Sequence, residues 1–201
     1  MHNVVDFPRQ APVIDRDALA IAFLKKVLPP QGRYCAFVKT RGRKKFNRFF
    51  ETVEELWDYL REVDRDGDNA YFALGSYGDD DERTQKNVIS LRCLWLDIDC
   101  GKDKPYRDVE EAVIALKRLC DGAKLPKPMI VKSGHGIHVY WPFNQAISPR
   151  EWLPYAKGLK AACIAHGLKA DQERTADRAS VLRPPGTHNH KDDWPKGRSP
   201  R

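Results

Sequence analysis

Cysteine is scarce in this sequence and shows no paired spacing. The 201 residues include five cysteines, an odd number without a CxxC pair, at positions 35, 93, 100, 120 and 163. This usage argues against a disulfide framework, and no set of cysteines and histidines has the spacing of a zinc module. We therefore expect free, reduced thiols and a cytoplasmic protein.

Long hydrophobic runs are also missing. Runs such as VVDF and AVIAL are far shorter than the ~18 residues that a membrane span requires. The N-terminal segment MHNVVDFPRQ lacks the basic start and the apolar stretch of a signal peptide. No internal repeat or low-complexity block is present. These absences argue against a membrane partner and favour an ordinary globular domain.

The charge balance favours an anionic partner. The sequence has 35 Lys and Arg against 28 Asp and Glu, so that 35 − 28 gives a net charge of +7. Hydrophobic residues make up 41% and charged residues 31%, values that are typical of a folded domain with a buried core. A basic chain of this kind is suited to a polyanion such as nucleic acid, but net charge alone does not identify one.

The order of helix and strand signals predicts an α+β fold with mixed or antiparallel sheets flanked by helices. Capping boxes at Thr52–Glu55 and Ser148–Glu151 each open a helical pattern, and Asp17 is a further candidate cap. The patterns predict helices over 17–27, 53–63, 108–120 and 149–165, and strands over 34–39, 46–50, 70–75, 87–99, 128–133 and 137–143. The stretch 170–191 is expected to be mostly extended. We expect an arm at 1–15, one domain at 16–191, and a basic linker at 192–201 that leads toward a possible downstream domain.

Two carboxylates close the most hydrophobic strand of the chain. Asp97 and Asp99 are two positions apart and so share one face, with Cα atoms roughly 6.6 Å apart. Carboxylate oxygens suit hard divalent cations such as Mg²⁺ or Mn²⁺. The alternative is a strand-end pair held by arginine or by backbone N–H groups. The DxD pattern alone leaves both interpretations open.

A glycine-rich turn follows, with a histidine on the next strand. Ser133 and Gly134 begin the segment SGHGIHVYW, in which the glycines let backbone N–H groups approach phosphate oxygens closely. His138 lies between apolar residues on this strand, where each ring nitrogen needs a partner. A strand histidine taken alone is more often structural than catalytic. The segment is a candidate nucleotide-binding turn.

Further charges cluster toward the C-terminus. Asp171 is a candidate third metal ligand, and Asp177 is the alternative. Arg183 precedes the segment PPGTHNHK, in which His190 and Lys191 add positive charge that suits phosphates. The alternative is a surface loop whose charges are solvated. The pattern alone does not distinguish this loop from a segment that binds metal and phosphate.

A dense group of cations occupies one predicted hairpin, interleaved with phenylalanines. Because the group has a single sign of charge, we expect it to contact template phosphates, with a solvated loop as the alternative. The residues are Lys39, Arg41, Arg43, Lys44, Lys45 and Arg48. Neighbouring aromatic rings could stack on bases, although we expect most of them to belong to the core.

Taken in order, these segments resemble the archaeo-eukaryotic primase superfamily, in particular the primase-polymerase domains of phage and plasmid replication proteins. That family carries a hydrophobic-DxD motif, a Ser/Gly-x-His motif on the following hairpin, an hD motif and an R-x-P-G-T-x-N-x-K segment. The chain has LWLDIDCGK, SGHGIHVYW, KAD at 169–171, and RPPGTHNHK. The resemblance extends over residues 30–191 and is specific as an ordered set.

The resemblance implies an RRM-like catalytic core with an N-terminal αβ subdomain. It implies a centre for two Mg²⁺ or Mn²⁺ ions formed by three acids, Asp97, Asp99 and Asp171. Nucleotide phosphates would be contacted by Ser133, Gly134, His138, Arg183 and Lys191. The implied activity is two-metal synthesis or extension of primers on single-stranded DNA from nucleoside triphosphates. It would serve phage or plasmid replication in the bacterial cytosol, with a possible fused or associated helicase.

Two other functions fit the same residues. A metal-dependent nuclease or relaxase would use these carboxylates and His138 for cleavage, and a non-catalytic module would bind a single strand or an origin. The sequence leaves open whether chains are started or only extended, which nucleotides are preferred, the template start sequence and the oligomeric state.

Overall fold

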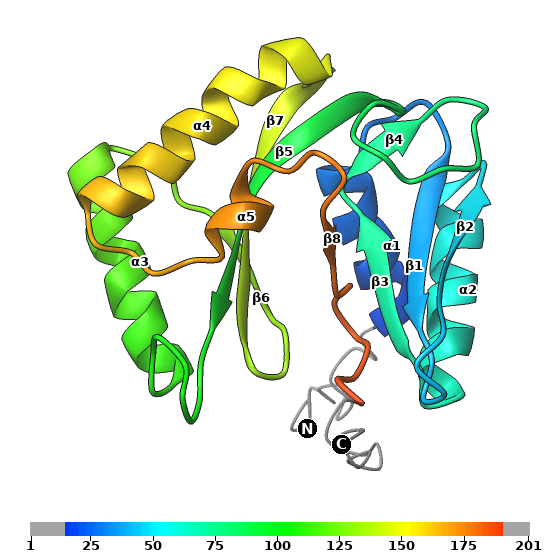
Figure 1. Cartoon of the computed structure of the whole chain (residues 1–201), viewed down its shortest axis with the longest axis horizontal. Coiled ribbons are helices and arrows are strands. Elements are labelled where there is room, and N and C mark those ends of the chain that lie inside the picture. The colour runs from blue at the N-terminus through cyan, green and yellow to red at the C-terminus, as the bar shows by residue number, and fades with distance from the viewer. Residues whose placement is uncertain (1–14, 191–201) are drawn as a thin grey trace, which may run out of the picture.

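Two four-stranded sheets form the framework of the protein in a computed structural model that describes residues 15–190 (Figure 1). One sheet has the order β2-β1-β3-β8 and the other has the order β4-β5-β7-β6. The strands are β1 (Tyr34–Lys39), β2 (Lys45–Phe50), β3 (Asn69–Ala73), β4 (Gly75–Tyr77), β5 (Val88–Asp99), β6 (Met129–Lys132), β7 (Gly136–Ile147) and β8 (Val181–Leu182). The helices are α1 (Arg16–Val27), α2 (Val53–Arg65), α3 (Val109–Ala123), α4 (Pro149–Ala165) and α5 (Gln172–Thr175).

The ladders between these strands are all antiparallel, which confirms the expected α+β class. Within residues 15–190, the parallel pairing is limited to an isolated bridge between Cys100 and Tyr106. Helix α2 covers β1 and β3, whereas α3 and α4 cover the sheet that contains β5 and β7 (Figure 1). Helix α1 packs against α2 and also contacts β5 and β7, with the Phe23 and Tyr140 ring centroids 5.1 Å apart, so it lies between the two sheets.

Local capping signals position the longer helices. Both predicted capping boxes are present, with reciprocal bonds between Thr52 and Glu55 and between Ser148 and Glu151. Helix α1 differs from the prediction, because Asp15 rather than Asp17 is its N-cap. The Asp17 carboxylate instead accepts hydrogen bonds across the helix pair from Trp57 Nε1 and Arg61, so it ties α1 to α2.

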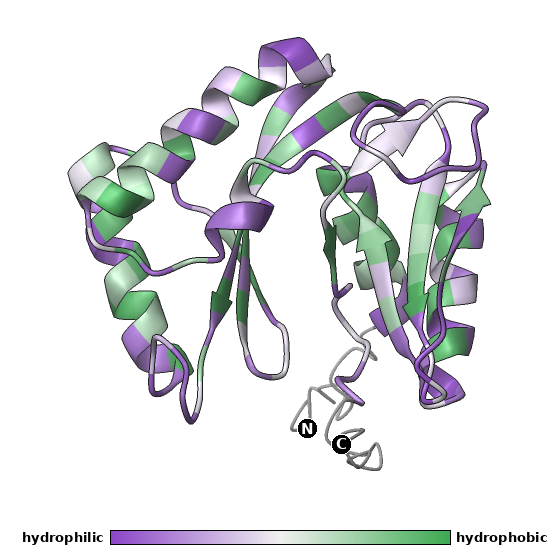
Figure 2. Ribbon diagram, in the orientation of Figure 1, coloured by the Kyte–Doolittle hydropathy of each residue, from purple (hydrophilic) through white to green (hydrophobic). Residues whose placement is uncertain are grey.

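Burial is greatest along the central strands, where Figure 2 shows mostly hydrophobic residues. Trp95 of β5 stacks on Trp152 of α4 with ring centroids 4.9 Å apart, and both side chains are fully buried. Trp152 Nε1 also donates to the Cys93 carbonyl over 2.8 Å. An aromatic pair of this kind contributes about 0.5–1.5 kcal/mol beyond its buried area. It anchors the strand that carries the DxD motif.

Gly136 allows the predicted hairpin at 134–136 to lie against the end of β5. Its φ is +154°, and a Cβ built there would lie 2.0 Å from the Ile98 carbonyl oxygen. Only glycine fits such an approach. The β5–β7 register then pairs Asp99 with Gly136 and Asp97 with His138. The glycine turn thereby brings the histidine next to the first carboxylate.

Two segments differ from the sequence-based prediction. The single strand expected at 70–75 is two strands in different sheets, because β3 ends at Ala73 and β4 begins at Gly75. Alternating hydrophobicity cannot signal that a chain changes sheets between two strands. The stretch 170–191 contains the short helix α5 and strand β8, both too short to produce a periodic pattern.

The described residues include no helix that is long and apolar enough to cross a membrane. The expected arm, apart from Asp15, and the expected linker at 192–201 lie outside the described residues, as does Lys191.

Candidate active site

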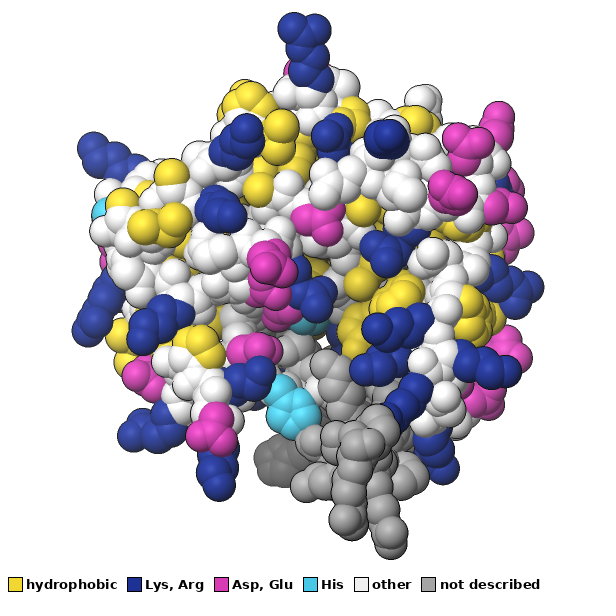
Figure 3. Space-filling view, viewed as in Figure 1, with side chains coloured by type: hydrophobic (Ala, Val, Ile, Leu, Met, Phe, Trp, Pro, Cys, Tyr) yellow, Lys and Arg dark blue, Asp and Glu magenta, His cyan; other side chains and the backbone are white. Residues whose placement is uncertain are grey.

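A cleft of about 470 Å³ opens between the two sheets and is lined by charged side chains from both. In Figure 3 the molecule is hollowed between its two halves, with Lys and Arg side chains on the β1–β2 side and acidic side chains on the opposite side. Strand β5, the β6–β7 hairpin and α5 supply Asp97, Asp99, Ser133, His135, His138 and Arg174. The cleft therefore brings the DxD motif and the SGHGIH segment together.

Asp97 and Asp99 point into the cleft from the end of β5, while Ile98 between them is fully buried on the opposite face. The side chain of Asp97 is 17% exposed and that of Asp99 is 51% exposed. Lys104 Nζ lies 2.8 Å from Asp99 Oδ2 and forms an ion pair with it. The two carboxylates thus share one face, as the spacing predicted.

His138 is buried beside Asp97, with Nε2 3.5 Å from Asp97 Oδ1. Burial disfavours the charged imidazolium and lowers the pKa of His138 to about 3. The ring is therefore neutral near pH 7, and its contact with Asp97 is not an ion pair. Because the ring lines the cleft, it is placed to form a hydrogen bond with a bound ligand.

Arg174 links two acids that are far apart in the sequence. Its Nε lies 2.9 Å from Asp171 Oδ2 and 3.4 Å from Asp97 Oδ2. Asp171 caps α5, and its backbone N–H donates to the Asp97 carbonyl over 2.8 Å. Asp171 is thus held beside the DxD strand, with a guanidinium between the two carboxylates.

Asp177, the alternative third acid, has a different local role. Its Oδ1 accepts a hydrogen bond from the Ala179 backbone N–H over 3.0 Å, and its Oδ2 lies 3.5 Å from Ser180 Oγ. The carboxylate therefore shapes the turn that precedes β8. Within residues 15–190, Arg174 forms its ion pairs with Asp97 and Asp171 and not with Asp177.

The glycine turn contacts the segment after β8. A Cβ on Gly134, which has a φ of +95°, would lie 3.0 Å from Asn189 Cβ. The Asn189 side-chain nitrogen lies 2.6 Å from His135 Nδ1. The Cys100 N–H donates to the His135 carbonyl over 2.8 Å, which fixes the turn to the end of β5. Ser133 lines the cleft at the start of this turn.

Arg183 is 4% exposed and directs its guanidinium at protein groups. Nη2 donates to Asn69 Oδ1 over 2.6 Å and to Asn189 Oδ1 over 3.2 Å, and Nη1 donates to the His188 carbonyl. The guanidinium also lies over the Tyr71 ring, 4.9 Å from its centroid. Burial lowers the pKa of Arg183. The residue lines the cleft and orders the chain that follows β8.

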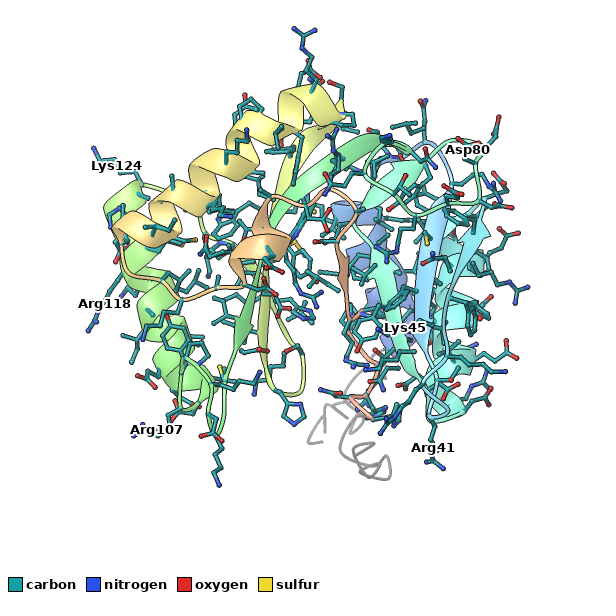
Figure 4. All side chains as sticks on the ribbon, in the orientation of Figure 1. Arg41, Lys45, Asp80, Arg107, Arg118 and Lys124 are labelled. Atoms are coloured by element: carbon teal, nitrogen blue, oxygen red, sulfur yellow. The ribbon has the colours of Figure 1, made fainter. Side chains whose placement is uncertain are left out.

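The basic hairpin is divided between two faces. Lys39 and Lys45 pair across the β1–β2 ladder and line the cleft. Arg41 lies at the tip of the hairpin and Lys45 on the cleft side of it (Figure 4). Arg48 packs over the ring of Tyr59 in α2, 4.6 Å from its centroid. The tip also carries Arg43 and Lys44, which are exposed and are not among the cleft-lining residues.

Several residues that line the cleft were not predicted from the sequence. Arg174 and Lys104 neutralise the acids, and Phe37 and Tyr71 present rings whose centroids are 5.9 Å apart. The position of Arg174 three residues after Asp171, at the start of a helical turn, was the available signal. Nothing in the sequence indicated that Lys104 would reach Asp99 or that two aromatic rings would face the cleft.

No family model matches this sequence, and no curated protein matches it. Two solved structures are similar. The AEP domain of the primase-polymerase (PrimPol) of cyanophage S-2L gives a TM-score of 0.60 at 16% sequence identity, over 88% of this chain and 84% of that domain. The primase RepB' gives a TM-score of 0.55 at 18% identity, over 88% of this chain and 52% of that protein. At these identities the similarity is one of fold.

Proposed function

Because the chain has the fold of archaeo-eukaryotic primase-polymerase domains, we propose that it is a nucleotidyltransferase that synthesises or extends primers on single-stranded DNA. The observation that carries this proposal is that Asp97, Asp99 and the buried His138 line one cleft, where Arg174 contacts both Asp97 and Asp171. The similar structures are titled as a primase-polymerase domain and a primase, which agrees with the activity expected from the motifs.

The acidic group fits divalent cations. Each carboxylate already has a cationic side chain as its counter-ion, Lys104 on Asp99 and Arg174 between Asp97 and Asp171. Ligands composed only of carboxylate oxygens suit Mg²⁺ or Mn²⁺. Two such ions, when bound, lower the pKa of an attacking 3′-hydroxyl and neutralise the charge that develops on the leaving pyrophosphate. We propose that Asp97, Asp99 and Asp171 hold them.

The remaining cleft residues would position the nucleotide. His138, neutral near pH 7, offers a ring nitrogen as a hydrogen-bond donor to a phosphate oxygen without changing the charge of the site. Ser133 lines the same cleft, and we propose that its hydroxyl and the backbone N–H of Gly134 after it contact a phosphate. Arg174, once displaced from the carboxylates, could reach phosphate oxygens as a bidentate donor. We propose that Arg183 mainly positions Asn189, to which it donates a hydrogen bond. The role of Lys191 as a phosphate contact is proposed from the sequence motif alone.

The opposite side of the cleft would hold the template. Lys39 and Lys45 present positive charge there, and the rings of Phe37 and Tyr71 lie beside them. Single strands bind to surfaces that combine phosphate-binding cations with stacking rings. We propose single-stranded DNA as the partner on this side. A helicase partner and a phage or plasmid host remain proposals that rest on the motif resemblance.

A labelled primer annealed to a longer single strand tests the activity. We expect extension of the primer when nucleotides and Mn²⁺ or Mg²⁺ are added. Asp97→Asn plus Asp99→Asn should abolish it, whereas Asp103→Asn should retain it, because Asp103 is an exposed loop residue whose φ of +60° asparagine tolerates. Shortened products would indicate a nuclease instead, and strand binding without any product would indicate a non-catalytic module.

The same assay distinguishes the two candidates for the third acid. Asp171→Asn should reduce extension as strongly as either DxD substitution, because Asp171 shares Arg174 with Asp97. Asp177→Asn should leave the extension rate within a few-fold, since its carboxylate bonds Ala179 in the turn before β8. The reverse result would assign the third ligand to Asp177.

A further inference from the structure

Three side chains that commonly bind metals gather at the edge of the first sheet, apart from the DxD carboxylates. Asp64 comes from the last turn of α2, and His188 and His190 come from the segment after β8. His188 Nδ1 lies 2.9 Å from Asp64 Oδ2, and His190 Nε2 lies 3.0 Å from Asp64 Oδ1. One ligand atom from each side chain lies within 4.8 Å of the other two.

Two of the three side chains are held firmly by their surroundings. The Asp64 side chain is 10% exposed and that of His190 is 16% exposed, whereas His188 is 78% exposed. The His188 N–H donates to Asp64 Oδ1 over 2.7 Å, and the His190 N–H donates to Asn69 Oδ1 over 3.2 Å. The carboxylate and one imidazole are thus preplaced, and the second imidazole faces solvent, from which an ion can enter.

We propose that Asp64, His188 and His190 bind one Zn²⁺ ion, or a divalent cation of similar ligand preference, at a site separate from the DxD carboxylates. Two imidazole nitrogens and one carboxylate oxygen form a ligand set that zinc prefers, whereas Mg²⁺ prefers oxygen alone. Ligand atoms of a tetrahedral zinc ion lie roughly 3.4 Å apart. The contacts of 2.9 and 3.0 Å end on different oxygens of Asp64, so an ion between the two rings would bind both oxygens, or one of them after a small rotation of the carboxylate. Water supplies the fourth ligand on the solvent side.

The position of this site connects it to the cleft. Asn189, between the two histidines, directs its side chain the other way, to His135 Nδ1 and to the Arg183 guanidinium. Residues i and i+2 of an extended segment share one face and residue i+1 takes the other. An ion on the histidine face therefore fixes the segment that presents Asn189 to the glycine turn. Zinc at this site has a structural role in the proposal and takes no part in nucleotide transfer.

The spacing of cysteines and histidines in the sequence gives no indication of this site. The two histidines are in a His-x-His spacing, but the third ligand is an aspartate 124 positions before His188. Only the packing of α2 against the segment after β8 brings the three together. The sequence still has no zinc module built from cysteines.

Zinc titration of the metal-free, full-length chain that carries Asp97→Asn and Asp99→Asn tests the proposal, because this background removes the carboxylate pair. We expect calorimetry to report one Zn²⁺ per chain. In the same background, His188→Ala plus His190→Ala should weaken zinc binding at least tenfold. His166→Ala is the matched control, since His166 is an exposed histidine at the end of α4, and it should leave the affinity unchanged.

Amide hydrogen exchange over residues 186–190 gives a second readout that does not depend on how the histidine variant folds. In the Asp97→Asn and Asp99→Asn chain, with its histidines intact, zinc should slow exchange in this segment severalfold. Failure to bind zinc, unchanged affinity in the double histidine variant, or exchange that zinc does not slow would each overturn the proposal. Neither readout involves nucleotide transfer, so the result is independent of the proposed function.

Discussion

His138 lies directly opposite Asp97 in the β5–β7 ladder, with 3.5 Å between Nε2 and Oδ1. The glycine turn sets this register, and the burial of the ring keeps it neutral near pH 7. Adjacent strands thereby hold the Asp97 carboxylate, which attracts cations, beside the neutral ring of His138, which can form hydrogen bonds. This pairing is the geometric basis for the separate metal-binding and phosphate-binding roles that we propose.

Removal of the His138 ring should affect catalysis more than folding. We expect His138→Ala to lower the rate of primer extension about 10²-fold, since loss of a positioning contact at a reacting group has effects of this size. Primer extension under single-turnover conditions measures the rate, and thermal unfolding measures stability. Val139→Ala is the control, because Val139 is buried on the opposite face of the same strand. It should lower stability and spare the rate of the folded protein.

Replacement of Arg174 should make the protein more responsive to divalent cations. Arg174→Gln leaves Asp97 and Asp171 without their shared guanidinium. A bound metal ion is then needed to offset the repulsion between the two carboxylates. We expect Mn²⁺ to raise the unfolding temperature of this variant by more than it raises that of the unsubstituted chain. Lys169→Gln removes an exposed charge nearby and should not alter the Mn²⁺ effect. If Mn²⁺ raised the unfolding temperature of Arg174→Gln and of Lys169→Gln by the same amount, the result would argue against a metal ion at Asp97 and Asp171.

Gly136 should not tolerate a side chain. The Cβ of Gly136→Ala would lie 2.0 Å from the Ile98 carbonyl oxygen, so the hairpin must move away from β5. We expect a loss of at least about 2 kcal/mol in the free energy of unfolding, measured by urea denaturation. Gly158→Ala is a matched control, because a Cβ there meets nothing within 4 Å and Gly158 lies inside α4. That variant should be stabilised by up to about 1 kcal/mol.

Two lysines should account for most of the salt dependence that the hairpin contributes to DNA binding. Lys39→Gln plus Lys45→Gln removes both hairpin cations that line the cleft. We expect weaker binding to single-stranded DNA and a slope of log affinity against log salt that is shallower by about 1.4, at about 0.7 for each phosphate contact. Fluorescence anisotropy at several salt concentrations measures both.

Arg48→Gln provides the comparison for this prediction. Arg48 belongs to the same predicted cationic cluster, but its guanidinium packs over Tyr59 of α2. The slope should therefore remain unchanged in this variant. A shallower slope for Arg48→Gln than for the lysine pair would place the template on the helix-covered face.

The elements that the sequence predicted are those with strong local signals. The capping boxes at Thr52 and Ser148, the hydrophobic strand that ends in Asp99 and the glycine hairpin are all present. The α+β class follows from their order, and the two similar structures share the fold that the motifs indicated. Local chemistry did not specify the passage of the chain from β3 to β4, since that depends on which sheet offers a free edge.

The site was predictable in its acids and its histidine, and less so in its cations. Asp97, Asp99 and His138 meet because they belong to adjacent strands with a fixed register. Lys104 and Arg174 reach the carboxylates through loop and helix geometry that leaves no periodic trace in the sequence. The hairpin cations were evident as a cluster in the sequence. Strand alternation places Lys45 and Arg48 on opposite faces of β2. Only the position of α2 shows that Lys45 faces the cleft and Arg48 faces the helix.

The short passage between β3 and β4 has a consequence for substrate choice. Leu74 alone separates the two strands, is fully buried, and donates its N–H to the Ser180 carbonyl over 3.2 Å. The sheets on either side of the cleft are therefore joined by a one-residue link that is itself clamped. We expect the gap between them to keep a nearly constant width, so that the nucleotides that we propose as substrates would be selected by how well they fit a preset slot rather than by closure around them.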